Sequence, residues 1–105
     1  MTFGDRPPAT LCVALRAGLV VNLFMFYTYI LKSDKDGKLY IGWTNDLKAR
    51  FIKHQKGLVI STKDRRPFQL IYYEACLIKE DAIRREKALK TGFGRAYIKR
   101  RISNI

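Results

Sequence analysis

The sequence predicts an α+β fold in which a three-stranded antiparallel sheet is flanked by helices. Two short runs of aromatic and β-branched residues bracket the turn signal Asp36-Gly37, a pattern typical of a β-hairpin. A third such run follows at 68–76, and segments with helical periodicity lie between and after the strands. A chain of 105 residues is the size of one domain, so these elements are expected to share one compact unit.

The predicted hairpin gathers tyrosines on one face of the sheet. Its strands, 26–32 and 38–44, are joined by a turn at 33–37. Alternate residues of a strand share a face. The residues grouped by this alternation are Tyr27, Tyr29 and Leu31 on the first strand, and Tyr40 and Gly42 on the second.

The first helix is predicted at 47–56. Thr44-Asn45-Asp46 offers N-cap side chains and Gly57 offers a stop, with apolar residues at helical spacing between them. Arg50 and His54 are one turn apart and therefore share a face. That face adjoins the apolar stripe, so both side chains are expected to border the core rather than fill it.

The second helix, from about Lys79 to Gly92, carries an acid in an unexpected place. At about 100° per residue, Glu86 falls about 40° from Ala82, inside the apolar stripe. One interpretation is that Glu86 extends from the edge of the stripe or pairs with a neighbouring cation. The other, which we favour, is that it supplies an oxygen ligand to Mg²⁺, a hard ion that binds carboxylates. The tail then predicts a short cationic helix with Tyr97, Ile98 and Ile102 facing inward.

The charge balance predicts an anionic partner. Lys and Arg number 21 against 9 Asp and Glu, a net charge of +12, which is the electrostatic footprint of a nucleic-acid-binding domain. Cys12 and Cys76 form neither a metal-ligand pattern nor a disulfide framework, which favours a reducing cytoplasm. We assign phosphate contacts to six cations: Lys48, Lys53, Arg65, Arg66, Lys99 and Arg100.

Residues 1–24 form a predicted N-terminal extension. The apolar run 11–31 has the length of a membrane span but carries Arg16, which costs about 2.5–3.5 kcal/mol in the middle of a span. Its composition changes near Met25, from Ala, Leu and Val to an aromatic strand-like pattern. We therefore expect Met25 to be the natural start, or residues 1–24 to be a helical or disordered arm, and no stable membrane association. A membrane-tethered basic protein ranks last among the alternatives.

Several of these residues together resemble the GIY-YIG nucleases. The second motif is intact as Tyr40-Ile41-Gly42, and the first stands as Tyr27-Thr28-Tyr29. Arg50 and His54 on the first helix and Glu86 in the second follow in the same order and approximate spacing. Residues 25–105 are similar to the stand-alone, single-domain bacterial branch of that family.

The resemblance implies a metal-dependent endonuclease acting on DNA with low sequence specificity, with single-stranded and branched DNA among its substrates. It implies one Mg²⁺ or Mn²⁺ ion on Glu86, a fixed cation at Arg50, and a phenol that orients or deprotonates water. Proximity to the metal ion and to Arg50 is expected to favour the phenolate, and His54 is expected to move a proton or bind phosphate. The implied catalytic set is Tyr29, Tyr40, Arg50, His54 and Glu86, with Gly42 letting substrate come close. The alternative is a nucleic-acid-binding module that keeps the fold but does not cut. The sequence leaves open which tyrosine is the base.

Overall fold

The computed structural model describes residues 11–14 and 20–102. Two short strands come first, β1 (Leu11–Ala14) and β2 (Val20–Leu23). The remaining elements are β3 (Phe26–Ser33), β4 (Leu39–Thr44), α1 (Leu47–Lys56), a 3-10 turn η2 (Lys63–Arg65), β5 (Phe68–Cys76), α2 (Lys79–Leu89) and α3 (Gly92–Arg101).

The main sheet has the order β4-β3-β5, and both pairings are antiparallel. The predicted α+β fold with three antiparallel strands is therefore confirmed. The central strand places Tyr29 opposite Gly42 of β4 and Tyr73 of β5. Because β4 pairs only with β3 among the described strands, its outer side is a free edge of the sheet.

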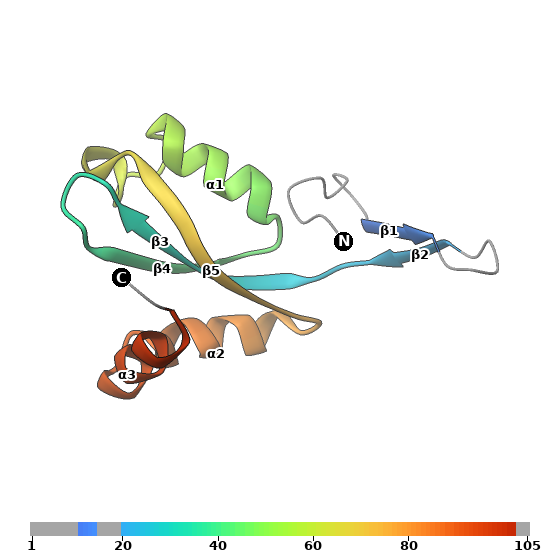
Figure 1. Ribbon diagram of the computed structural model, residues 1–105. Coiled ribbons are helices and arrows are strands. Elements are labelled where there is room, and N and C mark those ends of the chain that lie inside the picture. Colours follow the sequence, from blue (N-terminus) through green and yellow to red (C-terminus); the bar gives the residue numbers. More distant parts are fainter. Residues whose placement is uncertain (1–10, 15–19, 103–105) are drawn as a thin grey trace.

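Helices cover both faces of the sheet, α1 on one side and α2 with α3 on the other (Figure 1). The face under α1 buries Tyr27, Tyr29 and Leu31 with Leu47 and Phe68. The opposite face buries Ile30 with Leu89 of α2 and Ile98 of α3. Alternate side chains of β3 therefore lie in two separate hydrophobic cores, one on each face of the sheet. The inward placement of Ile98 agrees with the sequence prediction.

The first helix begins and ends where its sequence predicts. The Asp46 side chain accepts a hydrogen bond from the backbone N–H of Ala49, and Gly57 closes the helix at a φ of 77°. This left-handed conformation is one that glycine adopts without steric cost. These caps fix the length of α1 and, with it, the positions of Arg50 and His54.

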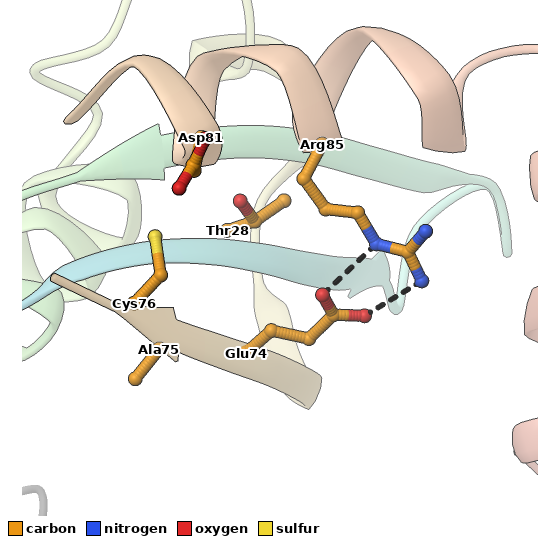
Figure 2. A pocket seen from close by; sticks show the side chains of 6 residues that line it. All are labelled: Thr28, Glu74, Ala75, Cys76, Asp81 and Arg85. Atoms are coloured by element: carbon orange, nitrogen blue, oxygen red, sulfur yellow. Dashed lines mark hydrogen bonds and ion pairs between the residues drawn. The ribbon is translucent and has the colours of Figure 1, made fainter. Parts of the chain in front are cut away.

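The second helix is anchored to the sheet on the side of β5. Arg85 donates two hydrogen bonds to Glu74, from Nε to Oε1 at 2.9 Å and from Nη2 to Oε2 at 3.0 Å (Figure 2). Thr28 adds a bond from its hydroxyl to the carbonyl of Ala82. Because successive helical residues differ by about 100° in direction, anchoring Arg85 toward β5 turns Glu86 toward β4.

The expected helical arm is wrong for the part of the extension that the structure describes. Leu11–Ala14 and Val20–Leu23 pair as antiparallel strands, in keeping with the strand propensity of their valines. The apolar run 11–31 is therefore divided among strands where it is described. Across residues 11–14 and 20–102, no helix is both long enough and apolar enough to cross a membrane.

Two glycines in the first turn of α3 allow a matched test of the α2–α3 corner. A Cβ at Gly94 would overlap the backbone of Ala88 and Leu89, whereas a Cβ at Gly92 would meet nothing within 4 Å. We expect Gly94→Ala to lower the free energy of unfolding by about 1–3 kcal/mol through overpacking. Gly92→Ala should be neutral or stabilising by up to about 1 kcal/mol, because alanine favours helix. Urea unfolding measures both, and equal effects would contradict the packing described.

Candidate active site

Tyr29 lies at the centre of the candidate site. Its side chain is 1% exposed, and its hydroxyl oxygen lies 2.8 Å from Nε2 of His54. The guanidinium of Arg50 donates to the same oxygen from Nε at 3.4 Å. Because Arg50 and His54 are one turn apart on α1, both reach one phenol of the central strand.

Gly42 makes room for this phenol. A Cβ at position 42 would lie 2.6 Å from the Tyr29 hydroxyl oxygen and 2.8 Å from its Cζ. The Tyr29 side chain therefore lies over the neighbouring strand, in the space that any other residue would fill. The sequence interpretation gave that space to substrate, but on this face Tyr29 occupies it.

His54 is fully buried, so the expectation that it borders the core is wrong. Its Nδ1 lies 2.8 Å from the hydroxyl of Thr62, which itself donates to the carbonyl of Val59 at 3.4 Å. This pattern assigns the ring proton to Nδ1 and leaves Nε2 to accept from Tyr29. Burial, and then the charge of Arg50, lower the pKa of His54 to about 4. The imidazole is thus neutral, and its burial keeps it away from any phosphate.

The Tyr29 hydroxyl stays protonated at neutral pH. Burial raises its pKa to about 12, more than the hydrogen bond from Arg50 lowers it, and the charge of Glu86 raises it further. Arg50 alone therefore does not favour the phenolate of Tyr29, because loss of solvent outweighs one neighbouring cation. A protonated phenol is, however, the donor that the unprotonated Nε2 of His54 requires.

Tyr40 is the more accessible phenol of the two. It is half-buried, and its ring centroid lies 5.0 Å from that of His54 and 6.3 Å from that of Tyr29. Its hydroxyl interacts with Arg50 and contributes to raising the pKa of that guanidinium, after the larger effect of Tyr29. The structure thus places one tyrosine inside the network and the other at its surface.

Glu86 lies on α2, on the opposite face of the sheet from α1 (Figure 1), and its charge is among those that raise the pKa of the Tyr29 hydroxyl. Its side chain is 18% exposed and pairs with Lys90 at 3.0 Å. With Lys79, these two residues form a stripe at i, i+7 and i+11 of α2, about 16 Å long. An acid therefore lies between two cations on one line of the helix.

The donor set fits a metal ion that is held partly by substrate. Within the described residues, no group of three or more His, Cys, Asp and Glu side chains converges. Mg²⁺ commonly binds through one or two carboxylates completed by water and substrate phosphate, and Glu86 can supply one. The Lys90 partner is 54% exposed, and an ion pair of that kind is worth only about 0–1 kcal/mol. Breaking the Glu86–Lys90 ion pair to bind a metal ion would therefore cost little free energy.

A cleft of about 370 Å³ lies beyond the C-terminal end of β4. We call it the polar cleft, and it is lined by Trp43, Thr44, Asn45, Arg50 and Lys79. Lys79 lies over the Trp43 ring, 5.5 Å from its centroid. Two cations from different helices thus face one opening beside Tyr40-Ile41-Gly42, which is an arrangement suited to a phosphate.

The six predicted phosphate contacts lie elsewhere. Four of them, three lysines and one arginine, are exposed on helices: Lys48, Lys53, Lys99 and Arg100. Arg66 is exposed and donates to the carbonyl of Lys63. Arg65 pairs with Asp36 at 2.8 Å and lies over the Phe68 ring, so it ties the hairpin turn to β5. None of the six lines the polar cleft.

Sequence reasoning missed Lys79 and Thr62, whereas Lys90 was among the cations with which the sequence allowed Glu86 to pair. The i, i+7, i+11 spacing of Lys79, Glu86 and Lys90 is a signal that could have found Lys79. Thr62 gave no such signal, because its role depends on a loop folding back onto α1.

The fold and this cluster define a class of protein. A small three-stranded sheet that brings Tyr, Arg, His and one Glu to its edge is the arrangement of a GIY-YIG nuclease domain. The chain matches the GIY-YIG catalytic domain family over residues 25–101 and belongs to that family, which is a family of nucleases.

Uncharacterised bacterial proteins are among its relatives. The chain is 47% identical over 66 residues to a UPF0213 protein of Staphylococcus saprophyticus, a match that covers 62% of this chain and 79% of the relative. It is 42% identical to a UPF0213 protein of Bacillus pumilus over 62% of this chain and 66% of the relative. A solution NMR structure of a UPF0213 protein from Bacillus halodurans is 34% identical, covers 70% of this chain and 81% of that one, and has a TM-score of 0.45.

The buried His54 predicts a pH dependence of stability. It is the only histidine of the chain, and its folded pKa of about 4 lies below the ordinary value of 6.5. The unfolded chain therefore binds a proton that the folded chain rejects, so stability falls as pH drops from 6.5 toward 4. We expect a loss on the order of 2–3 kcal/mol between pH 7 and pH 4.5, measured by urea unfolding. His54→Gln should flatten this slope, and an unchanged slope in that variant would refute the assignment.

Proposed function

We propose that this protein is a divalent-metal-dependent endonuclease that hydrolyses phosphodiester bonds in DNA with low sequence specificity. The observation that carries the proposal is the hydrogen-bonded cluster of Tyr29, Arg50 and His54 at the Gly42 edge, beside a cleft in which Arg50 meets a second cation, Lys79. The half-buried carboxylate of Glu86 on α2 is among the charges that act on the Tyr29 hydroxyl. Membership of a nuclease family supports the same chemistry.

Hydrolysis needs an in-line water, removal of its proton, and positive charge on the pentavalent phosphorus centre. Water adds to phosphorus and loses a proton to solvent, while the bond to the leaving sugar oxygen breaks and that oxygen takes a proton from solvent. We assign contact with the water to Tyr40, since it is the phenol that reaches the surface. Arg50 provides a fixed cation for a nonbridging oxygen, because its guanidinium is held by Tyr29.

One Mg²⁺ or Mn²⁺ ion, held by Glu86, would supply Lewis-acid charge on the scissile phosphate. Tyr29 and His54 act through Arg50 and Tyr40 rather than on substrate, since both are buried. They keep the guanidinium in one orientation, and they exclude water from beneath it. In this assignment Tyr29 and His54 are positioning residues, whereas Tyr40, Arg50 and Glu86 contact reacting groups.

Charge supports DNA, single-stranded or branched forms included, as the partner. The net charge is +12, and the cations of the polar cleft lie where a backbone phosphate would contact Arg50. Contacts of this kind carry no sequence information, so specificity is low and binding falls steeply with salt.

A binding module without catalysis is the second candidate. It is favoured by the Glu86–Lys90 ion pair, which occupies the carboxylate, and by the protonated Tyr29. Metal-dependent cleavage separates the two candidates, because a pure binder needs neither the carboxylate nor an ion.

Glu86→Gln tests the proposed function. Removal of the metal ligand should lower cleavage of DNA in Mg²⁺ by about 100-fold or more, a loss typical of removing charge stabilisation from a transition state. DNA affinity measured in EDTA should stay the same or rise slightly, because one negative charge is removed. Glu80→Gln, an exposed acid at the start of the same helix, is the matched control and should cleave normally. Equal cleavage by both variants would contradict the assignment of Glu86 as the metal ligand, and no cleavage by wild type in Mg²⁺ or Mn²⁺ would favour the binding module.

The two tyrosines should separate activity from stability. Tyr40→Phe removes the water-facing hydroxyl and should lower the cleavage rate by about 10²–10⁴-fold with little change in unfolding free energy. Tyr29→Phe leaves His54 and Arg50 without their shared partner and should destabilise the fold by about 1–3 kcal/mol. Single-turnover cleavage and urea unfolding measure the two effects. The assignment of Tyr40 fails if Tyr40→Phe cleaves at the wild-type rate.

A further inference from the structure

A second opening lies on the other side of the candidate site. We call it the edge groove; it has a volume of about 570 Å³ and lies between β4 and the α2–α3 pair. Its lining consists of Gly37, Lys38, Leu39, Tyr40, Ile41, Leu89, Lys90, Arg95 and Ile98. It shares Tyr40 with the candidate site, and its Lys90 is the ion-pair partner of Glu86.

The edge groove combines an aliphatic floor with a cationic rim. Leu89 and Ile98 are buried and form its back, while Leu39 and Ile41 are half-buried beside them. Lys38, Lys90 and Arg95 are exposed, and none of the residues that line the groove is acidic. A ligand with a flat apolar body and negative charge complements this surface, and a nucleotide has both.

We infer that the edge groove is a subsite for an unpaired base of a nucleic-acid strand whose neighbouring phosphate lies at Arg50 in the polar cleft. The inference rests on the proposed function and names the substrate form. In a duplex the faces of the bases are stacked, and only their edges line the grooves. The aliphatic floor can contact a base face only when that base is unpaired.

The two openings differ in the residues that line them, and this difference suits a single nucleic-acid strand that runs along the edge of β4. The polar cleft has two cations and no aliphatic floor, whereas the edge groove has both features. The stripe of Lys79, Glu86 and Lys90 connects them, because Lys79 lines the polar cleft and Lys90 lines the edge groove. A strand with a phosphate at the first opening and a base in the second passes Glu86 between them.

The direct test compares two single strands with the same phosphates. The probes are an oligonucleotide of about 12 thymidines, within the site sizes of small single-strand-binding domains, and an abasic strand of equal length. Affinity is measured in EDTA with the full chain, so the result does not depend on cleavage. Wild type should bind the base-bearing strand about tenfold more tightly, as expected for one stacked base. Equal affinities for the two strands would overturn the inference.

Ile41→Gln removes apolar contact from the floor without changing charge or adding an aromatic ring, and it should abolish this preference while leaving affinity for the abasic strand unchanged. Ile60→Gln, at a residue 90% exposed and outside the groove, should keep the preference. Should Ile41→Gln fail to fold by circular dichroism, Leu39→Ala replaces it and should reduce the preference about threefold, in proportion to the lost apolar area. A preference retained at full size in the folded groove variant would refute the subsite.

Arg95→Ala tests the rim. It should weaken binding of both strands equally and reduce the slope of log affinity against log salt by about 0.7, the value for one lost phosphate contact on single strands. Lys87→Ala, an exposed cation of α2 outside both openings, is the control and should bind both strands as wild type does. An unchanged slope in Arg95→Ala would show that Arg95 does not contact a phosphate.

The outcomes separate this inference from the proposed function. Cleavage by wild type together with equal affinity for the two strands would contradict the base subsite and still support the proposed nuclease activity. A base preference that Ile41→Gln abolishes, in a protein that does not cleave, supports the subsite and contradicts the proposed nuclease activity. Binding of poly-glutamate as tight as that of the thymidine strand, lost in Ile41→Gln, would assign the groove to an acidic peptide and overturn the nucleotide subsite.

Discussion

The arrangement of the site depends on one buried hydroxyl. Tyr29 donates to the imidazole of His54 and accepts from the guanidinium of Arg50, so one oxygen satisfies two side chains of α1. Thr62 extends the same chain of bonds to the loop after α1. Buried polar groups without partners cost about 1–3 kcal/mol each, so the sheet, the helix and the loop adopt mutually dependent positions. The orientation of Arg50 is a consequence of this network.

The two faces of the sheet carry different parts of the candidate site, and these two parts meet at Gly42. Under α1 the groups are buried and uncharged apart from Arg50, and they set the position of that cation. Under α2 the stripe of Lys79, Glu86 and Lys90 is accessible to ligands. A glycine on the edge strand lets the phenol of one face reach the edge that the acid of the other face approaches. Any side chain at this position would separate the two halves of the site.

The sequence predicts what is local and misses what depends on burial. Strand alternation, the Asp46 cap and the Gly57 stop were predictable because each depends on a few neighbouring residues. The gathering of Tyr29, Arg50 and His54 followed from the family resemblance. The neutral His54 and the raised pKa of Tyr29 were not predictable, because desolvation is a property of the packed core. Arg65 was predicted to bind phosphate but pairs with Asp36, which is distant in sequence.

The distribution of charge also constrains the order in which ligands bind. Glu86 stands between Lys79 and Lys90, in a chain with a net charge of +12. A divalent cation that approaches the free protein meets repulsion from these groups and a carboxylate already paired with Lys90. A bound phosphate reverses the local charge and supplies further oxygen ligands. For the proposed function, the electrostatics therefore favour binding of nucleic acid before a metal ion, which Glu86 would then help to hold.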